Sequence, residues 1–261
     1  MPVKILSIDE AVAEIPSDAS VALCGFDIVR APMALVFALA RRPNLEIDLI
    51  STPNPLAADL LIGTGSVRAA TLAFSGFQFA RGFAVGPMWK RAVEIEALEY
   101  REVDAYAILC GLKAAAMGLP FLPLTDIEGS ELVDKERWQQ VRDPWNGTTV
   151  TVTRPIRPDV ALVHAQVADH KGNLAIEDPI VDELVTKAAV EVIASAEKIV
   201  DRIEKPTVPF YLVDRLVEAP RGAWPSACPG VYSADHEHIH LYLKMAEEGR
   251  FDEYQRRFIE T

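Results

Sequence analysis

The sequence has little cysteine and no long apolar run. Its three cysteines, Cys24, Cys110 and Cys228, are widely separated among 261 residues, and none belongs to a Cys-x-x-Cys pair. This argues against a disulfide scaffold and against a zinc knuckle. Apolar stretches such as residues 34–40 fall far short of the roughly 18 residues of a membrane span. Residues 1–9 also lack the apolar run of a signal peptide. We therefore expect a cytoplasmic protein in a reducing compartment.

Positive charge is also scarce. Lys and Arg number 26 against 38 Asp and Glu, which gives a formal net charge of −12, and the basic residues form no run. A net anion repels a phosphate backbone, so nucleic-acid binding is disfavoured as the main function. Half of the residues are apolar, and a chain of this size can bury about 75% of the surface that it exposes when unfolded. The composition thus favours a globular protein with a sizeable core.

The order of the predicted elements indicates an α/β fold. A strand at residues 20–23, a turn at Gly25, a helix beginning at Pro32 and a strand at 45–51 are typical of a parallel sheet with helical crossovers. The pattern then continues along the chain. Further strands are predicted at residues 69–74, 95–100, 121–124, 148–153, 159–166, 174–176 and 191–200, and helices at 8–15, 57–62, 87–91, 104–117, 182–190 and 233–249.

No internal repeat or low-complexity tract divides the chain. Residues 126–147 are unusually charged and aromatic, and we interpret them as an excursion from the fold. The prediction is a single domain over residues 1–261, with a mostly parallel open sheet of seven or eight strands and flanking helices.

Common catalytic and cofactor motifs are missing. There is no Gly-x-Ser-x-Gly for a serine hydrolase, and Gly63-Thr64-Gly65 lacks the third glycine of a dinucleotide-binding loop. His236 and His240 are four residues apart on a predicted helix and would share a face. A solvated polar face is the simpler interpretation, so we predict no metal site. Cys228 follows several prolines and is the more accessible thiol, although a structural role is favoured for it.

Glu102 is the carboxylate whose position favours chemistry. It stands close to the end of a predicted strand and just before a helix. In α/β sheets, ligands bind beyond the carboxyl ends of the strands. Glu102 is therefore a candidate acid, base or nucleophile.

Five stretches, read in order, resemble the α subunit of class I coenzyme A transferases of the glutaconate type. The first is Gly25-Phe26 followed by Arg30-Ala31-Pro32-Met33-Ala34-Leu35-Val36. The others are residues 58–63 with the Gly76-Phe77 loop, residues 113–123 with Gly129-Ser130, residues 158–166 with Asp169 and Gly172-Asn173, and residues 218–223 with Pro225, Cys228, Tyr232 and Asp235. No single motif is decisive, but together they cover nearly the whole chain.

The resemblance implies the transferase/isomerase fold of the NagB, RpiA and CoA-transferase type. It also implies coenzyme A as substrate, with no permanently bound cofactor, and a β subunit in a heterodimer or heterotetramer. In that family a glutamate of the β subunit, in a Ser-Glu-Asn-Gly-like run, attacks an acyl-CoA before CoA passes to a carboxylic acid. This chain contains no Glu-Asn-Gly. The catalytic residue is therefore expected on the partner, and this chain would be incomplete alone.

The resemblance also assigns a part of the site to this chain. Gly25, Phe26 and Arg30 would shape the acyl or oxyanion side. Arg30 is expected either to pair with a substrate carboxylate or phosphate, or to form an ion pair at the beginning of a helix. The loop with Cys228 and Tyr232 is expected to pack at the subunit interface. Where the family has further glycines, this chain has Cys24 and Asp27, and Asp27 would place a negative charge beside an anionic substrate.

Two other functions remain open beside CoA transfer. A subgroup of the family hydrolyses a carbon–carbon bond to open a ring in a CoA thioester during steroid breakdown. Its Glu-Met-Asp-Glu-Gly run corresponds here to Glu102-Val103-Asp104-Ala105-Tyr106, so Glu102 is kept and the second glutamate is Ala105. This difference favours the transferase. The third hypothesis is a non-catalytic relative that binds a small metabolite or acts as a scaffold.

Overall fold

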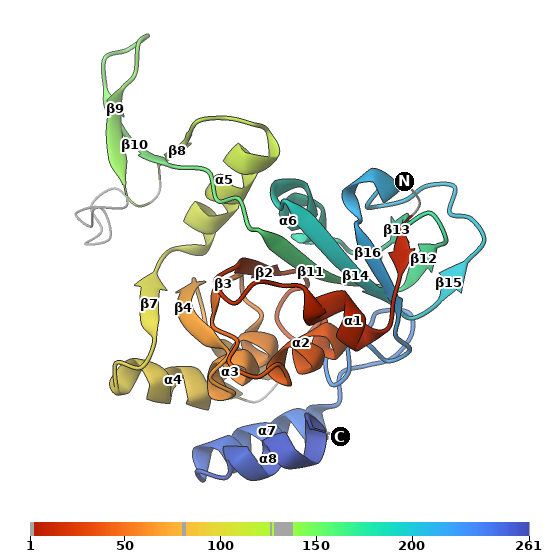
Figure 1. Ribbon diagram of the computed structural model, residues 1–261. Helices are drawn as coiled ribbons and strands as arrows, with labels where there is room; N and C mark the ends of the chain where they lie inside the picture. The colour runs from red at the N-terminus through yellow and green to blue at the C-terminus, as the bar shows by residue number, and fades with distance from the viewer. Residues whose placement is uncertain (1–2, 80–81, 126, 128–137, 261) are drawn as a thin grey trace.

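An eight-stranded sheet forms the centre of the molecule in the computed structural model, which describes residues 3–79, 82–125, 127 and 138–260. Its strands lie in the order β1-β16-β14-β11-β2-β3-β4-β7, and every neighbouring pair is parallel (Figure 1). Their bounds are β1 Lys4–Ile5, β2 Ser20–Leu23, β3 Ile47–Ser51, β4 Val67–Leu72, β7 Glu99–Glu102, β11 Val160–Ala165, β14 Glu191–Ala196 and β16 Arg215–Glu218. The predicted α/β fold with an open parallel sheet is confirmed.

Helices cover both faces of this sheet. The helices on one face share a core with the sheet (Figure 1). They are α1 Ile8–Ala13, α2 Met33–Ala40, α3 Pro55–Gly63, α4 Pro87–Glu94, α7 His236–Glu247 and α8 Phe251–Phe258. On the other face, α5 Ala105–Ala116 and α6 Asp182–Ala188 contribute to a second core. Within the described ranges, no helix combines the length and the apolar content needed to cross a membrane.

Local sequence explains where these elements begin and end. All six residues of β11 are buried, which explains their near-continuous apolar run, because a central parallel strand is covered on both faces. Ser7 and Glu10 form a reciprocal capping box at α1. Asp104 caps α5 by accepting a hydrogen bond from the Tyr106 N–H, and Gly118 follows this helix with a φ of +66°.

Several short elements differ from the prediction. The predicted Gly-rich loop is an antiparallel hairpin, β5 Gly76–Phe79 with β6 Gly82–Val85. The strand predicted at residues 95–100 lies later, because α4 continues to Glu94. The predicted strand 191–200 is divided into β14 and β15, Ile199–Val200, and β15 pairs with β12, Val167–Asp169, which also pairs with β13, Leu174–Ala175. Strand β16 and helix α8 were not predicted.

The predicted excursion at residues 126–147 falls only partly within the described residues, since 126 and 128–137 lie outside them. Beyond that gap, β9 Gln139–Arg142 pairs with β10 Thr149–Thr153, which also pairs with β8 Leu122–Leu124. These strands form an arm that projects from the α5 side of the sheet (Figure 1). The arm is antiparallel and separate from the main sheet.

A buried carboxyl group joins α3 to α4 and α7. Asp59 of α3 accepts hydrogen bonds from the Trp89 N–H at 2.7 Å and from the Tyr242 hydroxyl at 2.5 Å. The Asp59 carboxylate can lie close to the beginning of α4 because residue 86 is glycine. A Cβ at this position would lie 2.5 Å from Asp59 Oδ1. Burial raises the pKa of Asp59 to about 6, although the hydrogen bonds from Tyr242 and Trp89 oppose the shift.

This shift predicts a pH-dependent stability. The pKa of Asp59 is higher in the folded than in the unfolded state. The protonated carboxyl group therefore contributes fully to the free energy of unfolding below about pH 4, and this contribution is lost as the pH rises through about 6. One pKa unit corresponds to about 1.4 kcal/mol, so we expect the free energy of unfolding to fall by about 3 kcal/mol from pH 4 to 7. In Asp59→Asn this fall should be absent. Urea unfolding across this range measures it, with exposed Asp252→Asn as the control. Equal pH slopes in wild type and Asp59→Asn would contradict the assignment.

Candidate functional site

Two loops meet where the central strands end. One follows β2 and contains Gly25 to Arg30, and the other follows β16. The Arg30 N–H donates to the Ala227 carbonyl at 2.7 Å, and the Ala227 N–H donates to the Ile28 carbonyl at 2.8 Å. Gly25 has a φ of +83°, and a Cβ there would lie 2.6 Å from the Arg30 carbonyl oxygen. The tight turn therefore requires glycine at this position.

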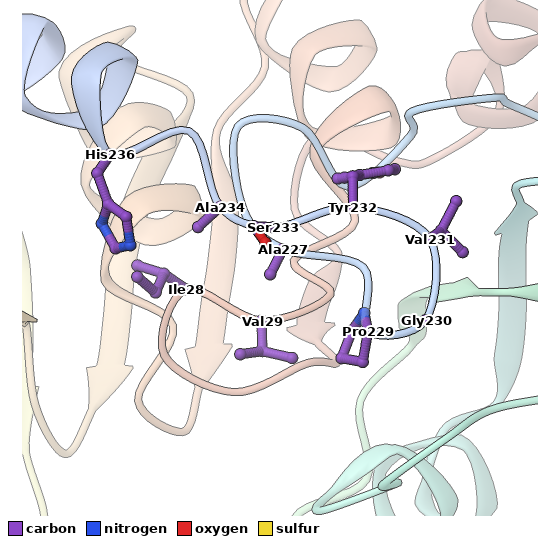
Figure 2. A pocket seen from close by; sticks show the side chains of 10 residues that line it. All are labelled: Ile28, Val29, Ala227, Pro229, Gly230, Val231, Tyr232, Ser233, Ala234 and His236. Atoms are coloured by element: carbon purple, nitrogen blue, oxygen red, sulfur yellow. The ribbon is translucent and has the colours of Figure 1, made fainter.

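Between the two loops lies an open pocket of about 510 Å³. Figure 2 shows Ile28 and Val29 on the first loop, opposite side chains of the second, with His236 at one end at the beginning of α7. The lining residues are Ile28, Val29, Ala227, Pro229, Gly230, Val231, Tyr232, Ser233, Ala234 and His236. Most of the described lining residues have apolar side chains, and none of them is a lysine, an arginine or a carboxylate, although polar atoms also face the pocket. This pocket suits the acyl chain of a substrate better than an anionic group.

Arg30 lies behind this pocket and is fully buried. Its guanidinium forms a bidentate ion pair with Asp182 at the beginning of α6, with N–O distances of 2.9 and 3.0 Å, and also donates to the Asp178 carbonyl. The second of the two expected roles, an ion pair at the beginning of a helix, matches these contacts. The Asp182 carboxylate also accepts the Gly25 N–H at 3.1 Å. Arg30 thereby fixes the turn on which the first loop depends.

The other residues of that loop are differently placed. Phe26 is half-buried, and its backbone pairs with Val29 in a tight turn. Cys24 is buried, which raises the pKa of its thiol well above the usual value. Asp27 has a φ of +53°, and burial raises the pKa of its carboxyl group, opposed by a hydrogen bond from the Ile28 N–H. Whether Gly25 and Phe26 touch an acyl group stays a prediction.

A buried polar network supports the second loop. His164 of β11 and Ser195 of β14 are register partners, and His164 Nδ1 lies 2.9 Å from Ser195 Oγ. Glu197 follows Ser195 by two residues, just beyond the end of β14, and its Oε1 lies 2.9 Å from His164 Nε2. The arrangement is similar to a Ser-His-Glu triad. However, Ser195 and His164 are fully buried, so no substrate reaches that serine.

Glu197 holds the loop in place. Its carboxylate accepts hydrogen bonds from the Tyr232 hydroxyl and from the Arg221 N–H, both at 2.6 Å. Burial alone would raise the pKa of Glu197, but the hydrogen bonds from His164, Tyr232 and Arg221 outweigh it and hold that pKa below its usual value. Burial lowers the pKa of His164 against the opposing effect of Glu197. Glu197 is thus an ionised acceptor beside a neutral imidazole.

Cys228 completes this network. Its sulfur, an imidazole nitrogen of His164 and a carboxylate oxygen of Glu197 lie within 4.8 Å of one another. Burial raises the pKa of Cys228 to about 12, with Glu197 adding to the effect. The thiol keeps its proton, and His164 and Glu197 already bond each other. The cluster therefore fits a hydrogen-bonded network better than a ligand set. Cys228 is fully buried whereas Cys110 is 7% exposed, so the prediction that Cys228 is the more accessible thiol is wrong, and its burial agrees with the structural role.

Glu102 does not lie in this cluster. It is the last residue of β7, at the same carboxyl edge of the sheet, but β3 and β4 separate β7 from β2. Three strand spacings amount to about 14 Å. Its side chain is exposed, so a partner chain has access to it. A catalytic role for Glu102 stays a prediction. His236 and His240 pack near Phe79, with ring centroids at 6.2 and 4.4 Å.

The network residues Ser195 and Glu197 were missed by sequence reasoning. One signal was present: His164 interrupts an otherwise apolar buried strand, and a buried histidine requires partners. Its partners are 31 and 33 residues away. Nothing in the local sequence distinguishes Glu197 from the surface glutamates.

Comparison with known proteins identifies the family. Residues 5–219 match the family model described as Coenzyme A transferase. The chain belongs to the coenzyme A transferase family. Members of this family use CoA thioesters as substrates, and the expected α-type character of this chain is confirmed.

Three relatives show the range of activities within the family. One chain of the decarboxylase AibA/AibB has a solved structure with 42% identity and a TM-score of 0.96, covering 100% of both chains. The cholesterol ring-cleaving hydrolase IpdA subunit of Rhodococcus jostii is 31% identical over 99% of this chain and 86% of its own length. The α-type chain of glutaconate CoA-transferase from Acidaminococcus fermentans is 27% identical, and its structure has a TM-score of 0.90, covering 98% of this chain and 88% of that one.

Relative length varies among the matches. This chain spans 59% of the length of a 33% identical uncharacterized protein of Archaeoglobus fulgidus. Because the similar proteins carry three different activities, membership of the family identifies the type of subunit and leaves the reaction to be inferred from the site.

Proposed function

We propose that this chain is the α-type half of a two-chain enzyme that breaks a carbon–carbon bond in a carboxylated acyl-CoA thioester, releasing CO₂. The acyl group would enter the pocket between Ile28 and His236. The observation that carries the proposal is the lining of this pocket, whose described residues include no lysine or arginine. The buried guanidinium nearby, that of Arg30, is already paired with Asp182.

A site that offers no cation favours loss of CO₂ over binding of a free acid. A carboxylate that leaves water without gaining a cation is destabilised, whereas neutral CO₂ is not. When the carbon–carbon bond breaks, its electron pair stays on the remaining carbon, where conjugation with the thioester carbonyl accepts it. A proton then takes the place of CO₂. The identity of 42% to a chain of a decarboxylase supports this reaction class.

CoA transfer remains the second candidate. The 27% identity to the α-type chain of glutaconate CoA-transferase over 98% of this chain favours it, with the catalytic glutamate supplied by a β subunit. Ring-opening hydrolysis is the related alternative, supported by the 31% identity to the IpdA subunit. A non-catalytic role has least support, because all three relatives are named as enzyme subunits or as an enzyme.

A charge placed in the pocket tests the assignment of the acyl site. In the complex with a co-expressed β-type chain, Val231→Asp is expected to raise KM for a carboxylated acyl-CoA by at least about tenfold, because the new carboxylate repels the substrate and disfavours apolar contact. Steady-state kinetics measure this effect. Val190→Asp is the matched control, since Val231 and Val190 are 52% and 61% exposed and Val190 is not among the pocket residues. Equal KM values for both variants would argue against the pocket.

A further inference from the structure

A second pocket, of about 310 Å³, lies on the α5 face of the sheet and has no assigned role. Its floor comes from β3, β4 and β7, and its rim from the segment that follows β10. The lining residues are Asp48, Ile50, Thr71, Arg101, Val103, Trp138, Thr153, Arg154, Pro155, Ile156 and Arg157. The volume is at the lower end of the range for small-molecule sites.

Three arginines and one aspartate line this pocket, in a chain whose net charge is −12. Arg101 is neutralised, because it contacts Asp48 Oδ2 at 2.6 Å and Glu99 at 2.9 Å. Arg154 and Arg157 are exposed, and neither forms an ion pair with another described residue. Among the described residues, therefore, no carboxylate neutralises these two guanidinium groups, and guanidinium is the side chain best suited to phosphate.

The rim that carries these two arginines is held against α5. The Ile156 N–H donates to the Gly111 carbonyl at 2.9 Å. A Cβ on Gly111 would lie 2.6 Å from Ile156 Cγ1, so glycine at this position lets the segment lie directly on the helix. Arg154 and Arg157, on either side of Ile156, are thus fixed at one pocket.

Two further features indicate more than a phosphate. The indole of Trp138 is half-buried at the pocket and offers an aromatic face. Asp48 Oδ1 is buried and has no hydrogen-bond partner within the described part of the chain. Leaving a buried acceptor without a hydrogen bond costs free energy. A ligand with an N–H or O–H group would supply the missing donor.

We infer that this pocket binds an adenine nucleotide moiety. The phosphates would contact Arg154 and Arg157, the base would stack on Trp138, and an amino or hydroxyl group would donate to Asp48 Oδ1. This chemistry is shared by free nucleotides such as ADP and by the nucleotide end of CoA. Binding is measured without turnover, so failure of this inference is distinguishable from failure of the proposed reaction.

Calorimetric titration of the full-length chain with ADP tests the inference. We expect saturable binding that weakens at high salt, and Arg154→Ala/Arg157→Ala should reduce the affinity by about tenfold or more, because two charge-assisted contacts are lost. Trp138→Leu should weaken ADP binding and leave inorganic pyrophosphate binding unchanged. Arg202→Ala is the matched control, an exposed arginine on the segment after β15.

The source of the nucleotide is distinguished by competition. If CoA displaces ADP in wild type and the double variant weakens both, the pocket holds the nucleotide end of CoA. If ADP binds and CoA does not compete, it is a site for a free nucleotide. Absence of ADP binding at millimolar concentration, or equal affinities for wild type and the double variant, would overturn the inference.

Discussion

Replacement of Glu197 by alanine is expected to lower the free energy of unfolding by about 3 to 5 kcal/mol, because the variant leaves the buried His164 and the half-buried Tyr232 hydroxyl without their acceptor. The Glu197 carboxylate bonds His164 Nε2, the Tyr232 hydroxyl and the Arg221 N–H. These three partners come from β11 and from the loop after β16, so one substitution detaches the loop from the sheet. Chemical denaturation measures the change.

The same variant should impair substrate binding, since Tyr232 lines the pocket. Glu197→Gln keeps the size and one acceptor oxygen, and we expect it to recover part of the stability. Glu204→Ala is the control, because Glu204 is 73% exposed and pairs with Arg202 at the surface, where an ion pair contributes about 0 to 1 kcal/mol. A loss below about 1 kcal/mol in Glu197→Ala would show that the network does not support the loop.

Replacement of Arg30 by methionine should also cost about 3 to 5 kcal/mol, because it leaves the Asp182 carboxylate buried without its cation. Both side chains of this pair are fully buried. Arg30 also has a φ of +51°, a conformation that its surroundings must maintain. Loosening this residue should release the turn at Gly25, whose N–H donates to the same carboxylate.

Denaturation and kinetics together separate the two roles that were expected for Arg30. An ion pair within the fold predicts a large loss of stability and a strong coupling between Arg30→Met and Asp182→Asn in a double-mutant cycle. A role in binding a substrate carboxylate predicts normal stability with a raised KM. Arg250→Met is the control, because Arg250 is 43% exposed and bonded to Glu248.

The sequence predicted the parts of the fold that depend on local pattern. Two such patterns are the apolar run of β11 and the Pro and Gly residues at the ends of elements. The folded chain has the strand and the element ends that these patterns indicate. Helix α8 was missed because only Phe251 and Tyr254 of its eight residues are buried. Strand β16 was missed because it has only four residues and begins with Arg215, a charged side chain that bonds Glu14 and Glu191.

The site was predictable only in part. The sequence resemblance pointed to the turn at Gly25, and the positive φ there explains why glycine is required. The partner of Arg30 is 152 residues away, and the partners of His164 lie on β14 and just beyond its end. Such contacts are decided by the register of β11 against β14 and by the crossover connections, which local periodicity does not specify.

The most direct test of the account is product analysis with the purified complex of this chain and a co-expressed β-type chain. The complex would be incubated with glutaconyl-CoA and longer carboxylated acyl-CoA thioesters labelled with ¹³C at the free carboxyl group, with and without an acceptor acid. The account predicts ¹³CO₂ release that needs both chains, needs no acceptor and leaves the thioester intact. Transfer of CoA to the acceptor without ¹³CO₂ would contradict the proposed reaction and establish the transferase instead.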